Sequence, residues 1–535
     1  MGERVRSHWA WGWDDRLPSV KARRALGQQL SFVLGIEPPT PRDAVPLSEA
    51  RCPEPRLAPP AALSDWCTDD RESRIRHTYG RSYRDIVRGF QGDFSGAPDL
   101  VARPPGEAEV SALLAWAEEV GAAVVPYGGG TSVVGGVECA PDDRYAGVIC
   151  LDTRGMDQVL EVDTVSRAAN IQAGATGPAL EAQLAEHGLT LRHFPQSFEF
   201  STLGGWIVTR AGGHFATLYT HIDDLVESVR MVTPTGIWDS RRLPASGAGP
   251  APDRLVLGSE GILGVVTSAW VRLQERPRWR SKASVHFADY EAGVGATRRI
   301  AQAGLYPTNC RLLDGNEALL NQVAAGIGAV LLLGFESADS PRRAWLERAL
   351  AIALEAGGVC PEPPEHSGPG ENVQGADAAG RWRRAFLDGP YLQSALVSLG
   401  VVVDTFETAV TWSRFPELHA SITKAVQGAM KEHCGGGFLS CRFTHVYPDG
   451  PAPYYTFIAP GGADPLRRWE AIKRAASDAL AAGGATITHH HAVGRLHRPW
   501  YDAEAPEPFR RSLSASKGAL DPSWILNPGV LIDRD

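Results

Sequence analysis

The sequence is poor in cysteine and in long apolar runs. Its eight cysteines stand apart and form no C-x-x-C pair, which favours a reduced, cytoplasmic protein. The longest apolar runs, at 327–335 and 396–403, are far shorter than a membrane-spanning helix, and the first residues show no signal-peptide pattern. We therefore expect a soluble chain, for which contact with a lipid surface stays open.

Net positive charge is also missing. The chain carries 53 Lys and Arg against 62 Asp and Glu, a net charge of −9, and its basic residues are scattered. The sequence therefore indicates no broad electropositive surface that could bind the phosphate backbone of a nucleic acid, and we expect no nucleic-acid partner. The length of 535 residues is about three times the ~150 of one domain, so two or three domains with sizeable cores are expected.

Glycine and proline are abundant instead. The 57 glycines and 39 prolines make up about 18 % of the chain, where about 12 % is average. They punctuate apolar segments and form no low-complexity tract, and neither G-x-G-x-x-G nor G-x-x-x-x-G-K-[ST] occurs. This pattern is typical of a globular chain with tight turns or backbone-lined pockets.

Apolar spacing and turn residues predict alternating helices and strands after an N-terminal arm. The arm, residues 1–93, contains a Pro-rich stretch and a helix at 69–88. Helices are predicted at 107–121, 179–187, 290–303, 342–356 and 422–433, and strands at 122–126, 168–173, 189–194, 283–287, 329–336 and 454–458. A polar, Gly/Pro-rich stretch at 359–380 is predicted to be a mobile loop. Such alternation favours α/β or α+β layers.

Three separated segments combine glycines with small or hydroxyl residues. They are 126–132 (PYGGGTS), 195–213 and 258–266. A glycine turn after a strand is commonly structural, but its backbone N–H groups can also point at an anion such as a diphosphate. Three such segments fit one elongated ligand better than three unrelated turns.

The order P-Y-G-G-G-T-S, P-x-S-x-E-F-S-T-L-G-G-W, T-R-A-G-G and E-G-x-L-G-V-V resembles the FAD-binding domain of the superfamily that includes vanillyl-alcohol oxidase and p-cresol methylhydroxylase. Over most of its length the chain resembles the alkyldihydroxyacetonephosphate synthase family. The motifs that carry this resemblance are W-x-W-G-W-D-D from Trp9, H-T-Y-G from His77, T-F-E-T from Thr405, C-R-F-T-H-V-Y from Cys441 and H-H-H-A-V-G from His489.

This resemblance implies an α+β fold: a two-subdomain PCMH-type FAD-binding domain at 94–276 and an α+β substrate (cap) domain at 277–480, with an antiparallel sheet and flanking helices. Residues 481–535 would return to the flavin site. The resemblance also implies FAD held by Pro126, Tyr127, Gly128, Gly129, Gly130, Thr131, Ser132, Pro195, Gln196, Ser197, Phe198, Glu199, Phe200, Ser201, Val208, Thr209, Arg210, Ala211, Glu260, Gly261, Ile262, Leu263, Gly264, Val265 and Val266.

Attachment of the flavin is expected to be non-covalent. Some members of the superfamily tether it through a histidine close after the glycine loop, where this chain has Val133 and Val134.

The triplet His489, His490 and His491 follows a β-prone run, 485–488. In an extended strand, His489 and His491 would share one face and His490 would point to the other. Histidine suits proton transfer near neutral pH. A metal site or a solvated strand end are the alternatives, and we expect no metal because H-E-x-x-H, a Cys pair and patterned carboxylates are all missing.

Three further residues are candidates through the resemblance. Tyr454 matches the catalytic tyrosine of the family, although an aromatic strand residue commonly packs in a core. Asn527 matches a C-terminal asparagine expected at the substrate, but it could equally cap a turn before a proline. Arg442 could orient the substrate, or could be an ion-paired arginine.

One position departs from the family. Where the family places an arginine that grips the substrate phosphate, this chain has Gln393. Glutamine can hydrogen-bond but cannot neutralise a dianion or clamp it with two parallel bonds. Either another arginine replaces it, or the substrate is uncharged or carboxylated.

The resemblance implies a redox-neutral reaction in which flavin N5 forms an adduct with the substrate and an acyl group is exchanged for an alkyl group. Tyr454 would act as acid and base, and the histidines would assist. The alternatives are an FAD-dependent oxidoreductase acting on a hydroxy acid or other alcohol, and a flavin-binding protein without activity. The family further implies a lipid-like substrate, peripheral membrane contact and a homodimer.

Overall fold

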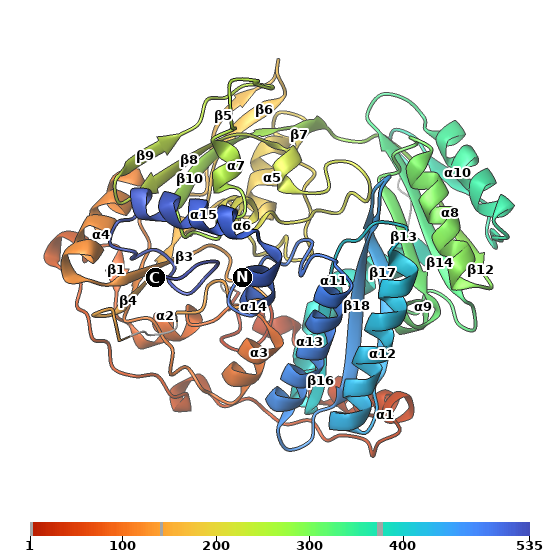
Figure 1. Cartoon of the computed structure of the whole chain (residues 1–535), viewed down its shortest axis with the longest axis horizontal. Helices are drawn as coiled ribbons and strands as arrows, with labels where there is room; N and C mark the ends of the chain where they lie inside the picture. Colours follow the sequence, from red (N-terminus) through yellow and green to blue (C-terminus); the bar gives the residue numbers. More distant parts are fainter. Residues whose placement is uncertain (1–3, 140–142, 372–377, 535) are drawn as a thin grey trace.

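The computed structural model describes residues 4–139, 143–371 and 378–534. Figure 1 shows two halves side by side: most of the chain between about residue 94 and residue 275 forms one half, and a large sheet with its helices forms the other. The mixture of parallel and antiparallel sheets with helices confirms the α+β expectation.

The first half contains two larger sheets and one small pairing of β7 (Leu189–Thr190) with β11 (Gln274–Glu275). One has the order β1-β2-β4-β3, with parallel pairing of β2 and β3 to β4; the other has the order β5-β6-β10-β8-β9 and is antiparallel throughout. The strands of the first are β1 (Cys67–Thr68), β2 (Leu100–Ala102), β3 (Ala123–Tyr127) and β4 (Val148–Asp152). Those of the second are β5 (Val159–Asp163), β6 (Ala168–Gln172), β8 (Val226–Thr233), β9 (Gly236–Asp239) and β10 (Val265–Arg272).

Helices α4 (Glu107–Val120), α5 (Gly177–Ala185), α6 (Leu203–Thr209) and α7 (Asp253–Val256) cover these sheets. Helix α4 follows the predicted spacing: Val110, Leu113 and Leu114 are fully buried. It ends at Gly121, whose left-handed backbone (φ +67°) is the expected C-terminal stop.

The second half is built on one seven-stranded antiparallel sheet, ordered β15-β12-β14-β13-β17-β18-β16. The strands are β12 (Trp279–Phe287), β13 (Asn309–Asp314), β14 (Ala329–Ser337), β15 (Glu365–Ser367), β16 (Val401–Glu407), β17 (Phe438–Val446) and β18 (Pro451–Pro460). Helices α8 (Tyr290–Gln302), α9 (Gly315–Leu320), α10 (Arg343–Glu355), α11 (Ala378–Ser398), α12 (Phe415–Cys434) and α13 (Pro465–Ala482) pack against it. The sheet and helices share the largest hydrophobic core.

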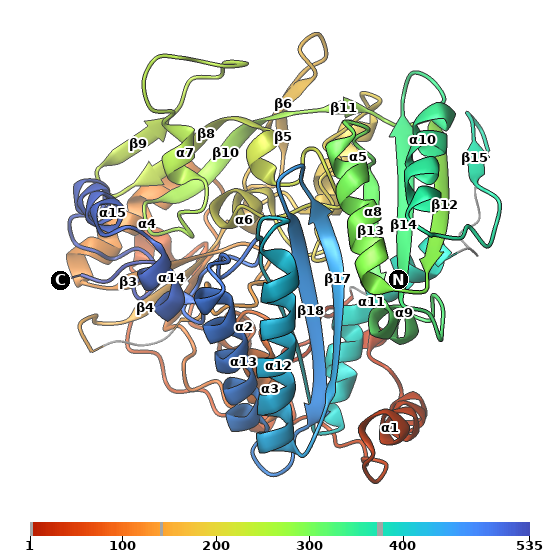
Figure 2. The ribbon, with the colours of Figure 1, turned by 45° about the vertical axis from the view of Figure 1, so that its right-hand side comes forward.

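Both ends of the chain cross between the halves. The arm contains α1 (Val20–Leu34), which projects from the body in Figures 1 and 2, and α3 (Tyr83–Phe90), which packs on the cap core. The C-terminal helices α14 (Arg498–Glu504) and α15 (Glu507–Leu520) lie against the first half, and Leu526 forms a parallel bridge with Val124 of β3. The C-terminal segment therefore returns to the glycine-rich region.

Several predicted elements are wrong in extent. The helix predicted at 69–88 is two helices, α2 (Arg71–Arg76) and α3, because His77 anchors the break to Asp152 and Ser82 caps the second helix. The strand predicted at 189–194 is reduced to β7 (Leu189–Thr190), since Arg192 has a positive φ of 56°. Helix α12 begins seven residues before the predicted 422, after Arg414.

The loop predicted at 359–380 is not a simple loop. It contains β15, which pairs with β12, and its last residues begin α11. Residues 372–377 of the prediction lie outside the described residues.

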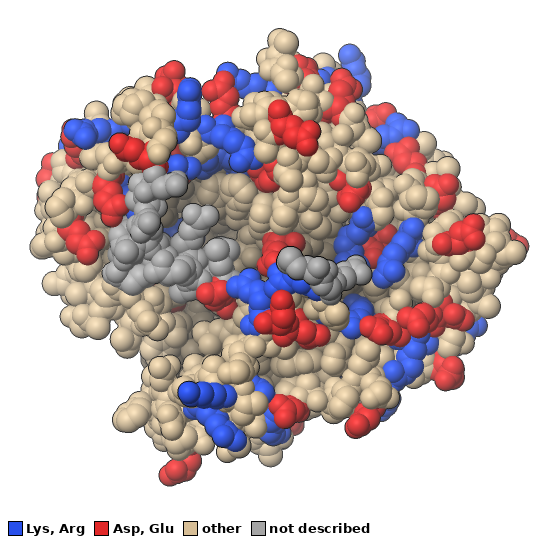
Figure 3. Space-filling view, turned by 180° about the vertical axis from the view of Figure 1, so that it is seen from behind, with Lys and Arg blue, Asp and Glu red and all other residues tan. Residues whose placement is uncertain are grey.

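Charge of both signs is interspersed over the face shown in Figure 3. Within the described part of the chain, no helix is both long enough and apolar enough to cross a membrane.

Candidate functional site

A cavity of about 920 Å³ lies where the two halves and the arm meet. Its wall on the first half is formed by the three glycine-rich segments, which we call the glycine wall. Its wall on the second half is formed by side chains of α11, β13, β16, β17, β18 and the histidine segment 489–491, which we call the cap wall.

Most residues predicted to hold FAD line this cavity. They are Pro126, Tyr127, Gly128, Gly129, Gly130, Thr131, Ser132, Pro195, Gln196, Ser197, Ser201, Val208, Thr209, Ala211, Glu260, Gly261, Gly264, Val265 and Val266. Three segments far apart in the sequence therefore meet at one elongated space, as the prediction required.

The glycines are needed because these segments press against one another. A Cβ on Gly129 would lie 2.1 Å from the carbonyl oxygen of Phe200, and one on Gly130, at φ +61°, would lie 1.8 Å from the Tyr127 hydroxyl. Side chains therefore cannot be added without separating the segments, and backbone rather than side chains faces the cavity. A flat, elongated ligand with a diphosphate fits such a lining.

Six residues predicted to hold FAD lie outside the cavity lining and support it from behind. Phe198 stacks on Trp206, Phe200 packs against two tryptophans of the arm, and Ile262 and Leu263 are buried in the core. Glu199 accepts a hydrogen bond from the Trp13 indole (2.6 Å), and Arg210 pairs with Asp223 (2.8 Å). Within each segment some residues face the cavity and others face away, which a motif alone does not predict.

Glu260 is the acidic residue of the glycine wall. Its buried carboxylate accepts hydrogen bonds from the backbone N–H groups of Val493 (2.9 Å) and Gly494 (2.9 Å). Burial raises the pKa of Glu260 to about 7, although the two backbone hydrogen bonds act in the opposite direction and lower the pKa. The contact ties the C-terminal segment to the glycine wall.

Asn527 is not in the cavity lining, so a direct substrate contact is not what the structure shows. Its buried side-chain amide donates to the carbonyl oxygens of Gly136 (3.0 Å) and Glu260 (2.6 Å). It also has a positive φ of 39°. Asn527 therefore joins Glu260 of the glycine wall to Gly136, which lines the cavity shortly after the first glycine segment.

Tyr454 lines the cap wall and is 5 % exposed. On β18 it lies opposite Arg442 of β17 and Glu407 of β16, and its hydroxyl donates to Thr405 Oγ1 (2.9 Å). The Arg442 guanidinium carbon lies 4.0 Å from the centre of the Tyr454 ring. Burial raises the pKa of Tyr454, whereas the Arg442 charge lowers it.

Arg442 is an ion-paired arginine as well as a cavity residue. Its Nη1 donates to Glu317, a fully buried carboxylate that also accepts from Ser440 Oγ (2.5 Å). A second buried arginine, Arg311, lines the same cavity from β13. Burial, with a smaller contribution from Arg442, lowers the pKa of Arg311 to about 9.

The histidine segment is not a strand. Residues 485–491 form bends, because the buried carboxylate of Glu407 gathers the backbone N–H groups of His489 (2.6 Å), His490 (3.2 Å) and His491 (3.0 Å). Thr488 Oγ1 also donates to it (2.6 Å). The predicted alternation is therefore wrong: His490 and His491 both line the cavity, and His489 does not.

The two cavity-lining imidazoles lie beside Tyr454. The ring centres of His490 and His491 are 6.0 and 5.5 Å from that of Tyr454. Burial lowers the pKa of His490 to about 3 and that of His491 to about 4, with the Glu407 charge opposing the shift. Both rings are therefore neutral near pH 7 and can each donate one hydrogen bond and accept another.

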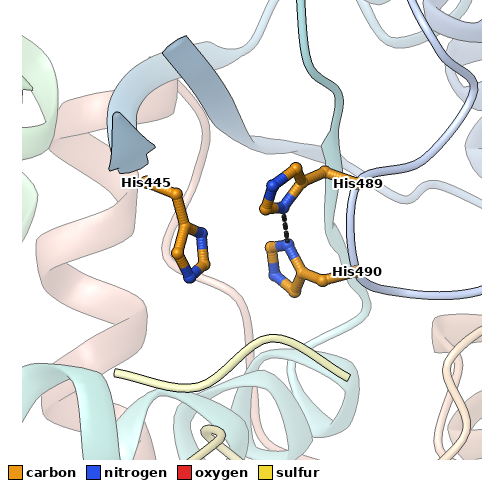
Figure 4. Close-up of side chains that lie close together, drawn as sticks. All are labelled: His445, His489 and His490. Atoms are coloured by element: carbon orange, nitrogen blue, oxygen red, sulfur yellow. Dashed lines mark hydrogen bonds between the residues drawn. The ribbon is translucent and has the colours of Figure 1, made fainter. Parts of the chain in front are cut away.

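A third imidazole, His445 of β17, joins His489 and His490 (Figure 4). One ring nitrogen from each lies within 4.8 Å of the others, an arrangement that could hold a metal ion. These nitrogens already have protein partners, however: His489 Nδ1 lies 3.0 Å from His490 Nδ1, and His445 contacts Thr444 Oγ1 (3.1 Å) and the Gly213 carbonyl (3.2 Å).

Gln393 lines the cavity from α11, and its amide donates to the Val403 carbonyl (3.4 Å). The arm docks on the same helix, where Trp11 N–H donates to Ser394 Oγ (3.0 Å). Arg16 of the arm also lines the cavity; it pairs with Asp388 (2.9 Å) and lies over the ring of Tyr391.

Sequence reasoning missed four groups of this site: the arm residues Trp11 and Arg16, Arg81 beside the glycine wall, Arg311 with Glu317, and Glu407 with His445. Trp11 and the last group had a signal, since these residues belong to motifs that carried the resemblance. The others reach the cavity through contacts between distant parts of the chain.

Comparison with known proteins agrees with this architecture. Residues 98–239 match the family described as FAD binding domain, and residues 276–531 match the family described as FAD linked oxidases, C-terminal domain. The alkyldihydroxyacetonephosphate synthase of Dictyostelium discoideum is 31 % identical over 490 residues, which cover 88 % of this chain and 79 % of that protein.

Solved structures share the fold. A structure of alkyldihydroxyacetonephosphate synthase superposes with a TM-score of 0.78 at 26 % identity, over 98 % of each chain. Substrate-bound p-cresol methylhydroxylase superposes with a TM-score of 0.66 over 89 % of this chain and 96 % of that one, at 15 % identity, a level that shows a common fold only.

Proposed function

Because the chain belongs to the alkyldihydroxyacetonephosphate synthase family of FAD-linked enzymes, we propose that it catalyses a redox-neutral exchange of an acyl for an alkyl group on a lipid-like substrate. The observation that carries the proposal is the single cavity, in which Tyr454, Arg442 and two neutral histidines face a wall of glycine-rich backbone. An acid–base group therefore stands opposite the surface that fits a flavin.

FAD would lie along the glycine wall, held by the backbone of 126–132, 195–201 and 260–266. When bound, it supplies an electrophilic centre to which a substrate carbon can be attached while one oxygen substituent replaces another. We propose non-covalent binding, since Val133 occupies the lining just after the glycine loop where some superfamily members have a tethering histidine.

The entering alcohol must lose a proton, and the acyl group departs as a carboxylate, so each exchange releases one proton. Tyr454 can take this proton as a base and give it up again as an acid, because its hydroxyl is held by Thr405 and its ring lies against the Arg442 cation, which favours the phenolate. A neutral His490 or His491 can accept the proton from Tyr454.

The anionic end of the substrate would be met by Arg311 and Arg442. They lie on the adjacent strands β13 and β17, where Leu313 pairs with Arg442, and Glu317 is the carboxylate that pairs with Arg442. Both guanidinium groups line the cavity, where they can form charge-assisted hydrogen bonds with a phosphate. This pair would replace the arginine that the family has at Gln393.

The alternative is oxidation of a hydroxy acid or other alcohol; the family that residues 276–531 match is described as FAD linked oxidases. The specific feature that favours it is Gln393, whose amide carries no charge for a phosphorylated substrate.

Purified protein should be yellow, and acid precipitation should release its FAD. Incubation with acyl-dihydroxyacetone phosphate and labelled hexadecanol should then transfer label into an ether product. A colourless protein that takes up no flavin would contradict the whole proposal, and anaerobic bleaching of the flavin with turnover of a hydroxy acid would establish the oxidoreductase instead.

A cytoplasmic location, a homodimer and peripheral membrane contact complete the proposal. The scattered cysteines support the cytoplasmic location, and the family resemblance supports the homodimer and the membrane contact.

A further inference from the structure

A row of hydrogen-bonding side chains starts at His490 in the cavity lining and continues through four residues outside that lining. His490 Nδ1 lies 3.0 Å from His489 Nδ1, and His489 Nε2 lies 2.7 Å from the Tyr447 hydroxyl. The row continues from Tyr447 to Thr220 Oγ1 (3.1 Å) and from Thr220 to His221 Nδ1 (3.3 Å). We call these five side chains the relay; its first link is drawn in Figure 4.

The contact that His221 makes at the last position of the relay fixes the direction of these hydrogen bonds. His221 Nε2 lies 2.9 Å from the backbone carbonyl oxygen of His489. A carbonyl only accepts, so a neutral His221 carries its proton on Nε2 and leaves Nδ1 as an acceptor. The Thr220 hydroxyl must therefore donate to His221, and its oxygen then accepts from the Tyr447 hydroxyl.

The same argument fixes the donors and acceptors from Tyr447 back to His490 in the cavity. Since the Tyr447 proton points to Thr220, its oxygen accepts from His489 Nε2–H, and the neutral His489 ring then has a bare Nδ1. His490 must donate to it from Nδ1–H, a position that Glu407 Oε2 at 3.5 Å also favours. His490 Nε2 is left without a proton, and it has no hydrogen-bond partner among the described residues.

We propose that His490 is a general base whose proton leaves the cavity through His489, Tyr447 and Thr220 to His221. The inference rests on the proposed function, which needs a proton acceptor beside Tyr454. In each passage Nε2 of His490 gains a proton, every group in the row passes one on to the next, and Nδ1 of His221 ends protonated. One proton is moved, no bond between heavy atoms changes, and no oxidant is required.

The far end of the relay lies outside the cavity lining. Thr220 is buried, whereas Tyr447 and His221 are half-buried and lie close in sequence to the exposed residues 448–449 and Tyr219. His490, by contrast, lies in the cavity beside Tyr454. The row therefore carries the proton from the cavity lining to a half-buried ring outside it, and the proton need not pass the substrate.

The tautomers can be measured without any substrate. Holoenzyme labelled with ¹⁵N in its histidines should show His221 protonated on Nε2 and His490 protonated on Nδ1, with assignments from His221→Gln and His490→Gln. The opposite tautomer at either ring would overturn the relay. This result does not depend on which reaction the enzyme performs, so the relay and the proposed function can fail separately.

A hydroxyl-specific pair of variants tests the transfer. Thr220→Val should lower the ether-forming rate about 10-fold or more and change its solvent isotope effect, whereas Thr220→Ser should retain both, because only the hydroxyl is needed. Thr217→Val is the matched control: Thr217 is in the same loop, and its hydroxyl donates to the Pro307 carbonyl (2.8 Å) outside the row.

Equal rates and isotope effects in Thr220→Val and wild type would refute the relay. A stoichiometric metal ion retained by purified holoenzyme and lost in His445→Gln would do so as well, since the nitrogens of His489 and His490 would then be ligands instead of a hydrogen-bonded pair.

Discussion

The two walls of the cavity present different chemical groups to a ligand. The glycine wall presents backbone and small side chains; Glu260 is the carboxylate of its three segments that lines the cavity, and it is occupied by backbone N–H groups. The cap wall presents ionisable side chains, among them Tyr454, Arg311, Arg442, His445, His490 and His491. A ligand that must be held in one orientation meets rigid backbone, whereas the reacting atoms meet groups that move protons. Substitutions in the two walls should therefore separate binding from chemistry.

The largest effect should come from removing the Tyr454 hydroxyl. Tyr454→Phe keeps the ring beneath Arg442, so FAD content and thermal stability should stay near wild type. Turnover should fall about 10²- to 10⁴-fold, because an acid–base group of this kind contributes that much. Steady-state kinetics measure turnover, and flavin absorbance measures the FAD content. Near-normal turnover of the variant would show that the Tyr454 hydroxyl takes no part in the reaction.

The glycine wall should show the opposite pattern. Gly130→Ala places a Cβ against the Tyr127 hydroxyl at a positive φ, and about 1–3 kcal/mol of strain would weaken FAD binding roughly 5- to 150-fold. Turnover per bound flavin should change little.

Gly121→Ala is the control, since it has a similar φ of +67° in open space. Equal loss of FAD in both variants, measured by flavin titration, would show that backbone strain alone is responsible and that the wall has no special role.

A smaller effect is expected from the carboxylate that shapes the histidine segment. Glu407→Gln keeps the size of the side chain but removes the charge that accepts three backbone N–H groups. One such bond contributes about 1.5–3 kcal/mol, so displaced imidazoles should lower turnover roughly 10-fold while FAD affinity is retained. Unchanged turnover would mean that the position of His490 and His491 does not matter.

The smallest effect concerns the substrate. Gln393→Arg should raise kcat/KM for acyl-dihydroxyacetone phosphate by a few-fold at most, because Arg311 and Arg442 already supply cations. A neutral analogue should show no gain. No change with either substrate would place the phosphate beyond the reach of position 393.

How far the sequence could predict this molecule differs between the walls. The glycine-rich segments are local sequence patterns, and their glycines directly indicate where backbone approaches a ligand. Accordingly, 19 of the residues proposed to bind FAD line the cavity. Which residues face inward was not visible: Phe198 and Glu199 turn away to pack against Trp206 and Trp13. That choice depends on neighbours from other segments.

The arrangement of the cap wall could not be predicted from the sequence, because it depends on contacts between residues that are distant along the chain. A β-prone run indicated a strand before His489, but three N–H groups bond to Glu407, which is distant in the sequence, and this outweighs local preference. The arm reaches the cavity through Trp11 and Ser394, which lie almost four hundred residues apart. No local pattern encodes such contacts.

The central claim is that this cavity exchanges groups without net oxidation. The most direct measurement mixes the purified protein anaerobically with acyl-dihydroxyacetone phosphate and labelled hexadecanol while flavin absorbance is recorded. We predict many turnovers of labelled ether per flavin, with free fatty acid released in equal amount and the flavin oxidised at the end. Reduced flavin, with turnover that continues only when an electron acceptor is added, would contradict the account.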